Sequence, residues 1–455
     1  MLNVGEIRSN SSAYFGAKQP DVYWIEGGSK EIGAMEHKVG KRAQRWLVIC
    51  CLSLLVVLVA AFTFVKANVF GSRVNLPSSI SSSTTSSTRP TVGISAPSLY
   101  SSPNHPAIYN IESFGADPTG RKDSTVAIRA AIQAAEAKPG SEVYFPPGRF
   151  ILDRSSPKLF DFVISKPIEV VGAGIHRTTI VNEVGQKTPG VKLSTDMFAI
   201  NVALGQQTGG GSGSTITNMT LDSASYDAGT DIMDFANHTT LSNLKVLAAR
   251  STNTYNYNSF GVRVIAICNP STVSHIYRVD NVINNVTIVG QGSQGTTELD
   301  LSCQVGTTAS NINIEGNGVD IFYCHNDTIS NASLVGGMNG STHFYTWVIT
   351  GSYNIRLSHI NANGIGGVIA PDVHIVSHDI SITNEIMQNK SSFLYIGDSR
   401  DVSISNSSLG AIAILPKYSV SELSLKNTTY LSIKCAHSAA ITGLSGLACP
   451  SYSHS

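Results

Sequence analysis

Three ionisable residues occupy the same position relative to a short motif that recurs in the second half of the chain. Asp300, Asp320 and His343 each lie eleven residues before an asparagine that is followed by an apolar, any, apolar triplet. If the motif marks stacked strands about 4.8 Å apart, the three side chains form one column. Carboxylates stacked this closely raise one another's proton affinity, which leaves one protonated acid and one charged base, the pair that glycoside cleavage requires. An imidazole beside them can take either role.

The alternation of apolar residues predicts which way these side chains point. Asp300 lies between two leucines, and Asp320 lies between a valine and an isoleucine. Because side chains alternate along a strand, apolar neighbours that face the core send both aspartates to the outer face. On the His343 coil the outward set continues through Tyr345 and Trp347, whose rings can bind substrate by stacking on a sugar. A register error of one residue would reverse these faces, and surface aspartates without any function are the alternative.

Two other groups of ionisable residues could also form a site: Asp231, Asp234 and His238, and Asp372, His374 and His378. Acidic residues at turns more often cap backbone groups than catalyse a reaction, so we rank both groups below the first column. No group of histidines or cysteines has the spacing of a metal site. We therefore expect no cofactor; calcium stays possible, although no calcium-binding motif is evident.

The motif recurs nine times along the chain. An asparagine or acidic residue precedes the apolar, any, apolar triplet at Asn218, Asn243, Asn285, Asn311, Asn331, Asn354, Asp379, Asp401 and Glu422. Successive intervals are 25, 42, 26, 20, 23, 25, 22 and 21 residues, and we interpret the 42 as two periods with one weak copy. A period of 20 to 26 residues with strand-like alternation indicates a solenoid.

Leucine-rich repeats and parallel β-helices both have such a period. Isoleucine and valine are as frequent as leucine at the apolar positions of this motif, and no helix-forming stretch separates the strands. Asparagine precedes the strand, where stacked asparagines can bond to one another from coil to coil. These features favour a β-helix, in which the apolar side chains fill the interior.

The amino-terminal part of the chain predicts a membrane anchor. Residues 46–65 form an uncharged apolar run of about the length that crosses the hydrocarbon core as a helix. Four basic residues lie between 38 and 45, so the positive-inside bias places residues 1–45 in the cytoplasm and the bulk of the chain outside, as a single-pass cell-membrane protein. A cleaved signal peptide is the alternative, but it would have a shorter apolar core nearer the terminus.

Composition divides the rest of the chain. Residues 1–45 show no periodicity, and residues 66–105 are rich in serine, threonine and proline, so we predict a disordered tail and a disordered linker. The formal net charge is zero, which argues against a nucleic-acid partner. Five cysteines lie beyond the span, so at least one thiol is unpaired, while Cys435 and Cys449 can close a short disulfide loop.

The beginning of the domain at residues 106–455 has a specific pattern. A helix capped by Ser124 and ended by Pro139-Gly140 is followed by short strands around a Pro-Pro-Gly turn. The residues that carry the pattern are Phe114-Gly115-Ala116-Asp117, Asp123, Ala130, Ile132 and Tyr144-Phe145-Pro146-Pro147-Gly148. They resemble the entry module of the pectate-lyase-like superfamily, with its rhamnogalacturonase and epimerase-like pectate lyase domains. The resemblance implies a right-handed parallel β-helix and a carbohydrate substrate lying along one sheet.

The resemblance does not imply one reaction, because this fold hosts several. The polygalacturonase motifs Asn-x-Asp, Asp-Asp and Gly-His-Gly are missing from the sequence, as are the clustered aspartates of calcium-dependent lyases, and residues 371–374 have the types of an epimerase Asp-Pro-His-Asp motif in another order. We therefore expect an all-β, right-handed parallel β-helix with a short amino-terminal capping helix, acting on polysaccharide as a hydrolase, lyase or epimerase. A non-catalytic carbohydrate-binding or cell-surface structural β-helix is the alternative.

Overall fold

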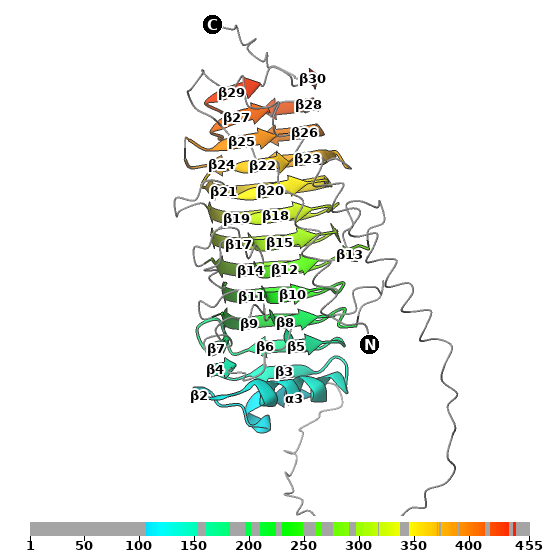
Figure 1. Ribbon diagram of the computed structural model, residues 1–455, viewed down its shortest axis with the longest axis vertical. Helices are drawn as coiled ribbons and strands as arrows, with labels where there is room; N and C mark the ends of the chain where they lie inside the picture. Colours follow the sequence, from blue (N-terminus) through cyan, green and yellow to red (C-terminus); the bar gives the residue numbers. More distant parts are fainter. Residues whose placement is uncertain are drawn as a thin grey trace, which may run out of the picture. The chain divides into compact units, whose positions relative to one another are not determined.

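In a computed structural model of the protein, parallel β-strands stack coil upon coil along one axis (Figure 1). The structure describes residues 106–152, 160–182, 196–201, 210–223, 230–248, 260–265, 276–290, 297–316, 318–336, 345–370, 372, 375–389, 391–414, 419–435 and 440–442. The predicted tail, membrane span and linker, residues 1–105, lie outside these ranges. Within the described part, no helix is long and apolar enough to span a membrane.

One flank of each coil contributes a strand to an eleven-stranded parallel sheet. Its strands are β5 (Phe160–Ile164), β8 (Asp196–Ile200), β10 (Thr230–Asp234), β12 (Phe260–Ile265), β15 (Thr297–Ser302), β18 (Val319–Phe322), β20 (Trp347–Thr350), β22 (Gly367–Ala370), β25 (Phe393–Ile396), β27 (Ala411–Ile414) and β29 (Ser432–Cys435). Each strand pairs in parallel with the next one in this order, so the sheet runs the length of the stack.

The other flank forms a seventeen-stranded sheet whose long strands bend. Its long strands are β9 (Thr215–Asp222), β11 (Thr240–Leu247), β14 (Val282–Val289), β17 (Thr308–Gly316), β19 (Thr328–Gly336), β21 (Tyr353–Asn363), β23 (Ser377–Thr383), β26 (Ser399–Ser405) and β28 (Ser419–Lys426). Its short strands are β1 (Ile108–Asn110), β2 (Thr119–Asp123), β3 (Glu142–Phe145), β4 (Gly148–Leu152), β6 (Glu169–Gly172), β7 (Thr178–Asn182), β24 (Ile386–Met387) and β30 (Ala440–Thr442). A separate pair joins β13 (Arg278–Val279) to β16 (Gln304–Val305).

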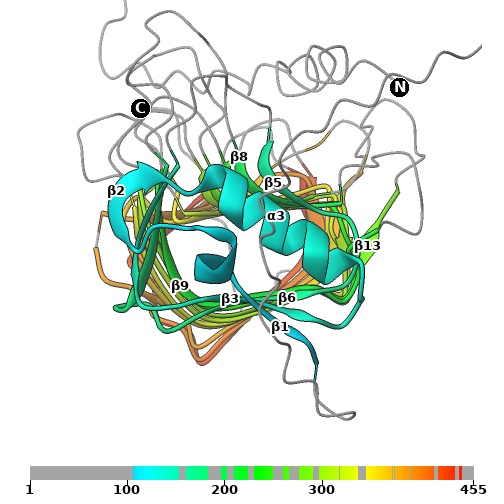
Figure 2. The same ribbon diagram turned by 90° about the horizontal axis from the view of Figure 1, so that it is seen from below.

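A helix closes the amino-terminal end of the stack, as predicted. Helix α3 (Thr125–Glu136) follows the 3-10 turn η1 (Ile111–Phe114) and lies across the first coils (Figure 2). Its buried face, which includes Ile128 and Ile132, packs on the strands beneath it. Ser124 is the N-cap residue, but its hydroxyl accepts from the Asp117 amide instead, and the Asp123 carboxylate accepts from the first helical amide. The helix thus covers apolar residues that an open coil end would expose.

Backbone geometry at two corners explains the repeated asparagines. Each of nine coils has two residues with positive φ, separated by five positions. These pairs are Gly213 and Asn218, His238 and Asn243, Asp280 and Asn285, Gly306 and Asn311, Asn326 and Asn331, Asn354 and His359, Asp379 and Asn384, Asp401 and Asn406, and Glu422 and Asn427. The left-handed region costs a side chain with a Cβ, and asparagine, aspartate and glycine tolerate it best. All nine motif residues predicted from the sequence occupy such corners.

The predicted asparagine ladder is confirmed at the second corner. Asn285 donates to the Oδ1 of Asn243 at 2.7 Å, and Asn331 donates to the Oδ1 of Asn311 at 2.5 Å. These bonds link side chains on neighbouring coils at the bend between the two parts of each long strand. They satisfy polar groups that the sharp turn exposes, and they fix how adjacent coils align.

The structure corrects the repeat in two places. The first five motif residues lie at the second corner, but Asn354 and the three that follow lie at the first corner, five residues earlier in the coil. His359 therefore stacks on Asn331, since Ser330 pairs with Ser358 and Ala332 with Ile360. The interval of 42 residues is a single coil rather than two, because β11 pairs directly with β14.

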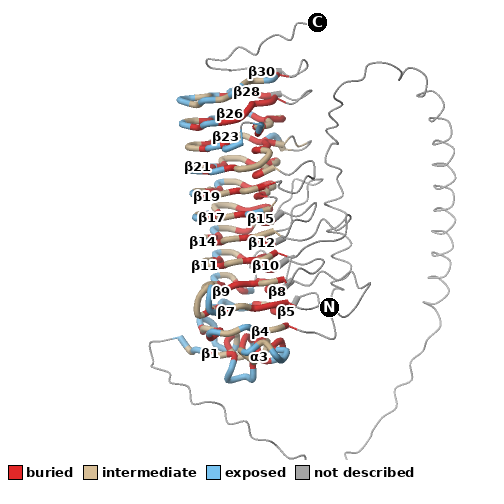
Figure 3. The backbone as a smooth tube through the Cα atoms, turned by 90° about the vertical axis from the view of Figure 1, so that its left-hand side faces the viewer, coloured by how far each residue is buried: buried red, intermediate tan, exposed pale blue. Residues whose placement is uncertain are grey.

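The interior is apolar along most of the stack (Figure 3). Ile312 and Ile355 are buried, whereas Ser403 is exposed, as the alternation predicts. At each corner the alternation skips one residue: Ile283 and Val286 both face inward on either side of the bend. Inward and outward residues can thus be assigned for every described strand, which decides where functional side chains lie.

Candidate active site

The outer face of the eleven-stranded sheet carries a column of charged residues. Arg263 on β12 pairs with Asp300 on β15, and Asp300 pairs with Asp320 on β18. Neighbouring residues in each strand face the core, so these three side chains point outward. The predicted stacking of Asp300 on Asp320 is confirmed. Their Cα atoms are separated by one coil, about 4.8 Å.

The predicted third member, His343, does not continue this column. Val348 pairs with Asp320, and His343 itself lies outside the described residues. The error follows from the corner shift, because counting eleven residues back from His359, the true equivalent of Asn331, gives Val348. The offset was sound and the reference residue was wrong.

Asp300 is held in place by two partners. The Nε of Arg263 donates to Oδ2 at 2.7 Å, and the Ser302 hydroxyl donates to Oδ1 at 2.6 Å. The Asp300 side chain is only 4% exposed and that of Arg263 is 10% exposed, so water screens this ion pair little. Arg263 was not anticipated, although the alternating sequence of β12 points it outward. Its coil was hidden in the interval that we interpreted as two periods.

Trp347 is not an outward sugar-binding residue, contrary to the prediction. It pairs with Val319, which faces the core, and it is 1% exposed. Its indole Nε1 donates to the Oε1 of Glu385 at 2.9 Å inside the stack. The one-residue difference between Trp347 and Val348 turns the predicted outward set inward, as a register slip does.

Tyr345 lies in an aromatic cluster on the outer face. Its ring meets that of Tyr395 at a centroid distance of 5.7 Å, and Tyr395 stacks on Phe393 at 5.4 Å. Tyr395 belongs to the same outward column as the carboxylates, because it pairs with Val368, which pairs with Val348. Burial raises the pKa of both tyrosines, so their hydroxyls are protonated donors at neutral pH. The cluster thus lies three coils beyond Asp320, roughly 14 Å along the stack.

Two further acids share this face. Asp231 and Glu298 each precede an outward column residue by two positions, and both are buried. The Ser223 hydroxyl donates to Asp231 at 2.5 Å. Glu298 extends over two glycines, because a Cβ added at Gly290 or Gly316 would meet its Oε1 at 2.0 or 2.1 Å. Nothing in the spacing of the repeat pointed to either acid.

The group Asp231, Asp234 and His238 does not form one site. Asp231 faces outward, whereas Asp234 faces the interior and accepts from the Thr239 hydroxyl and the Ala236 amide. His238 lies at the first corner, where its Nδ1 is 3.6 Å from Asp280. Alternation along β10 separates the two aspartates onto opposite faces, which a sequence group cannot show.

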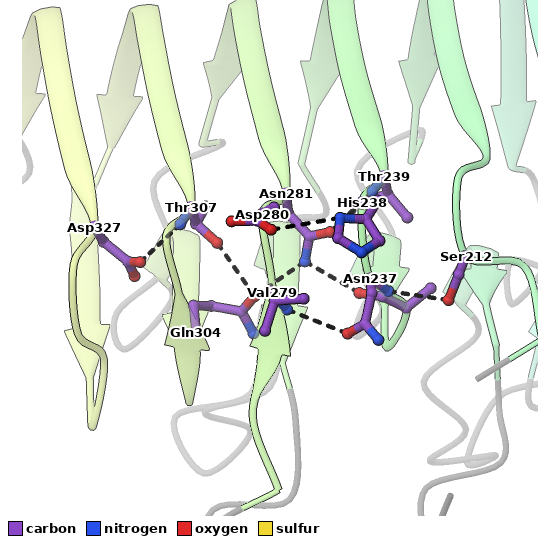
Figure 4. A network of polar contacts seen from close by, with 11 residues as sticks. Ser212, Asn237, His238, Thr239, Val279, Asp280, Asn281, Gln304, Thr307 and Asp327 are labelled. Carbon is purple, nitrogen blue, oxygen red and sulfur yellow. Dashed lines mark hydrogen bonds and ion pairs between the residues drawn. The ribbon is translucent and has the colours of Figure 1, made fainter. Parts of the chain in front are cut away.

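Asp234 begins an interior polar network that runs across several coils (Figure 4). The Thr239 hydroxyl donates to the Oδ1 of Asn281, and the Nδ2 of Asn281 donates to the Oε1 of Gln304 at 3.0 Å. The Thr307 amide then donates to Asp327 at 2.8 Å. Buried polar groups linked in this way specify coil alignment.

Three interior carboxyls give the protein a pH-dependent stability. Burial raises the pKa of Asp234, Asp327 and Glu385 to about 7 each. Between the ordinary pKa near 4 and the folded value, the unfolded chain releases these protons while the folded chain keeps them. Stability should therefore be full below about pH 4, fall as the pH rises to about 7, and then level off. We expect a melting temperature several degrees higher at pH 5 than at pH 7.5, measured by differential scanning calorimetry.

The matched variant for this prediction is Glu385→Gln, which keeps the shape of the side chain and removes its titration. The difference in melting temperature between the two pH values should shrink in this variant. Asp401→Asn, a change at an exposed corner, serves as the control and should leave the difference as it is. A melting temperature that rises from pH 5 to pH 7.5 would contradict the assignment.

The group Asp372, His374 and His378 is only partly described. The Tyr323 hydroxyl donates to the Oδ2 of Asp372 at 2.6 Å, and burial together with this carboxylate raises the pKa of Tyr323. His378 stacks on Tyr353 at 4.9 Å and bonds to Asp379 at 2.7 Å, while His374 lies outside the described residues. Asp372 and His378 thus have separate partners.

No set of three or more histidine, cysteine or carboxylate side chains could hold a metal ion within the described ranges. Cys303 and Cys435 are disulfide-bonded to cysteines outside those ranges. Cys324 is a free, buried thiol, and burial raises its pKa. The described outer face therefore presents carboxylates, one guanidinium and aromatic rings as its reactive and binding groups.

Comparison with known proteins links the chain to one family and to a few relatives. The model of the family described as "Rhamnogalacturonase A/epimerase, pectate lyase-like" matches residues 108–342, more than half of the chain. Mannuronan C5-epimerase AlgE1 of Azotobacter vinelandii is 40% identical over 73 residues, which is 16% of this chain and 5% of the epimerase. Alginate lyase 7 of the same organism is 39% identical over 75 residues, 16% of this chain and 8% of the lyase. The matches thus span a small part of these relatives.

Among solved structures, the A-module of mannuronan C-5 epimerase AlgE6 from Azotobacter vinelandii is similar to this chain at 17% identity and a TM-score of 0.35. The similarity covers 74% of this chain and 98% of the module.

Proposed function

Because the chain belongs to the rhamnogalacturonase A/epimerase, pectate lyase-like family, we propose that it acts on polysaccharide, at the outer face of its eleven-stranded sheet. The resemblance inferred from the entry module is thereby confirmed. The observation that carries the proposal is the outward column in which Arg263, Asp300 and Asp320 stack on successive coils. Relatives named as an epimerase and a lyase of polysaccharides support it.

The proposed chemistry assigns different roles to the two aspartates. Asp300 is fixed by Arg263 and Ser302, so it supplies a charged carboxylate at a set position. Asp320, one coil further and half-buried, is the group that exchanges a proton with the substrate. Carboxylates on adjacent coils are closer than the 6.5–9.5 Å that inverting glycosidases use, so a hydrolase of this kind would be retaining.

The aromatic cluster provides a place for the sugar chain to bind. Tyr345, Phe393 and Tyr395 lie along the same face as the carboxylates, about three coils away. Sugar rings that stack on these side chains would extend a bound polysaccharide along the stack and over Asp320. This arrangement supports an enzyme whose site takes several sugar units at once.

The purified full-length chain, screened against a panel of polysaccharides, tests the proposal. New reducing ends would indicate hydrolysis, absorbance of unsaturated products would indicate elimination, and changed sugar stereochemistry by NMR without cleavage would indicate epimerisation. A chain that neither converts nor binds any member of the panel would contradict the proposal.

A second candidate function is non-catalytic binding, which one observation favours. The outward positions between the two corners form two rows along the stack, and fourteen of their eighteen residues are hydroxyls: Thr215, Thr217, Thr240, Ser242, Thr308, Ser310, Thr328, Ser330, Ser358, Ser381, Thr383, Ser403, Ser405 and Ser424. A flat hydroxyl face can bind a glycan without chemistry. A binder of this type would lose polysaccharide retention in a Thr308→Glu, Thr328→Glu double variant and keep it in Asp320→Asn.

We also propose that residues 46–65 anchor the protein in the cell membrane, with residues 1–45 in the cytoplasm and the β-helix outside. The proposal rests on the uncharged apolar run and the basic residues before it. Protease added to intact cells should remove the β-helix domain and leave an epitope at the amino terminus protected. Full protection of the domain would contradict this orientation.

A further inference from the structure

The charges on the outer face of the eleven-stranded sheet are unequal. In the described part of the coils that carry the column, Asp231, Glu298, Asp300 and Asp320 face outward, and Arg263 is the cation among them. Arg263 is bonded to Asp300, which leaves an excess of carboxylates around that ion pair. We leave Asp161 out of this count, because Arg129 lies beside it and donates to its backbone carbonyl.

Other cations lie too far along the sheet to balance these acids. Lys434 belongs to the same outward column, where it approaches the ring of Phe393 at 5.3 Å. It is five coils beyond Asp320, roughly 24 Å along the stack. This separation is about three Debye lengths at physiological ionic strength, so its charge is screened.

A polysaccharide with an acid on every sugar would bring like charges together here. Bringing like charges together across a binding interface costs several kcal/mol, and the small exposure of Asp300 limits the relief that solvent can give. Neutral sugars meet no such cost, and their hydroxyls can donate to the carboxylates. Amino sugars would be attracted.

From this charge distribution we infer that the polysaccharide acted on at this face carries no acidic groups; the inference rests on the proposed function. The face selects against polyuronates and sulfated glycans through Asp231, Glu298 and Asp320, and it accepts neutral or amino glycans. The family match by itself would not make this selection, because it indicates a fold and leaves the substrate's charge open.

The test is affinity electrophoresis of the full-length chain in gels that contain one glycan each: a neutral β-glucan, a neutral galactomannan, chitosan, alginate or polygalacturonate. At low ionic strength we expect at least about tenfold tighter retention by a neutral or amino glycan than by either acidic one. Glu298→Gln combined with Asp320→Asn should weaken the repulsion and narrow this ratio, whereas Asp401→Asn, the same kind of change at an exposed corner, should leave the ratio unchanged.

The outcomes separate this inference from the proposed function. Tighter retention by the acidic glycans, lost in Asp320→Asn, would overturn the inference and leave the site in place. Retention by no glycan, or retention of every kind that Asp320→Asn leaves unchanged, would overturn the proposed function and this inference with it.

Discussion

Asp320→Asn should lower the rate of polysaccharide turnover by orders of magnitude while leaving the fold intact. The amide keeps the shape of the side chain but can neither give nor take a proton near neutral pH, so only the chemical step is lost. Asp320 is half-buried on the outer face, where such a change costs little stability. Initial rates on the glycan found in the screen, together with circular dichroism and melting temperature, measure both effects.

Asp300→Asn should reduce turnover to a similar degree but should also lower the melting temperature. Its carboxylate balances Arg263, and removing one partner of a buried ion pair leaves the other charge uncompensated. Asp320→Asn is therefore the cleaner test of catalysis, and Asp401→Asn is the matched control that should retain full activity. Wild-type turnover in the double variant of Asp300 and Asp320 would place the active site elsewhere.

Ile312→Asp and Ile355→Asp should each prevent folding. Both isoleucines are buried between neighbouring coils, with exposures of 2% and 0%, so an aspartate there would be an unpaired charge in an apolar interior. A penalty above about 4 kcal/mol is expected, which is a large part of the stability of an ordinary domain. Expression of soluble protein and its circular dichroism spectrum measure the outcome.

Ser403→Asp is the control for that experiment. Ser403 lies on a strand of the same sheet, between two inward residues, and its side chain is exposed. The same introduced charge should be tolerated there, with a melting temperature close to that of the wild type. If Ser403→Asp and the two isoleucine variants behave alike, the assignment of inward and outward faces is wrong.

The sequence by itself determined the parts of this protein that depend on neighbouring residues. The alternation around Ile312, Ile355 and Ser403 follows from the strand period of two, which any stretch of about five residues displays. The nine motif residues were found because a left-handed corner demands asparagine, aspartate or glycine locally. The stacking of Asp300 on Asp320 was predictable because two consecutive coils use the same corner as their reference and have the same length between column and corner.

Only the tertiary structure decided which residues of different coils lie on one another. The segments that close each coil differ in length, so a motif tells where a strand bends but not which of the two corners it forms. Asn354 marks the first corner, and this shift of five residues replaced His343 by Val348 in the column and turned Trp347 inward. The pairing of Arg263 with Asp300, 37 residues apart, depends on a coil that the repeat could not resolve. Coil alignment is fixed by backbone pairing, buried polar bonds and packing between coils, which no local pattern contains.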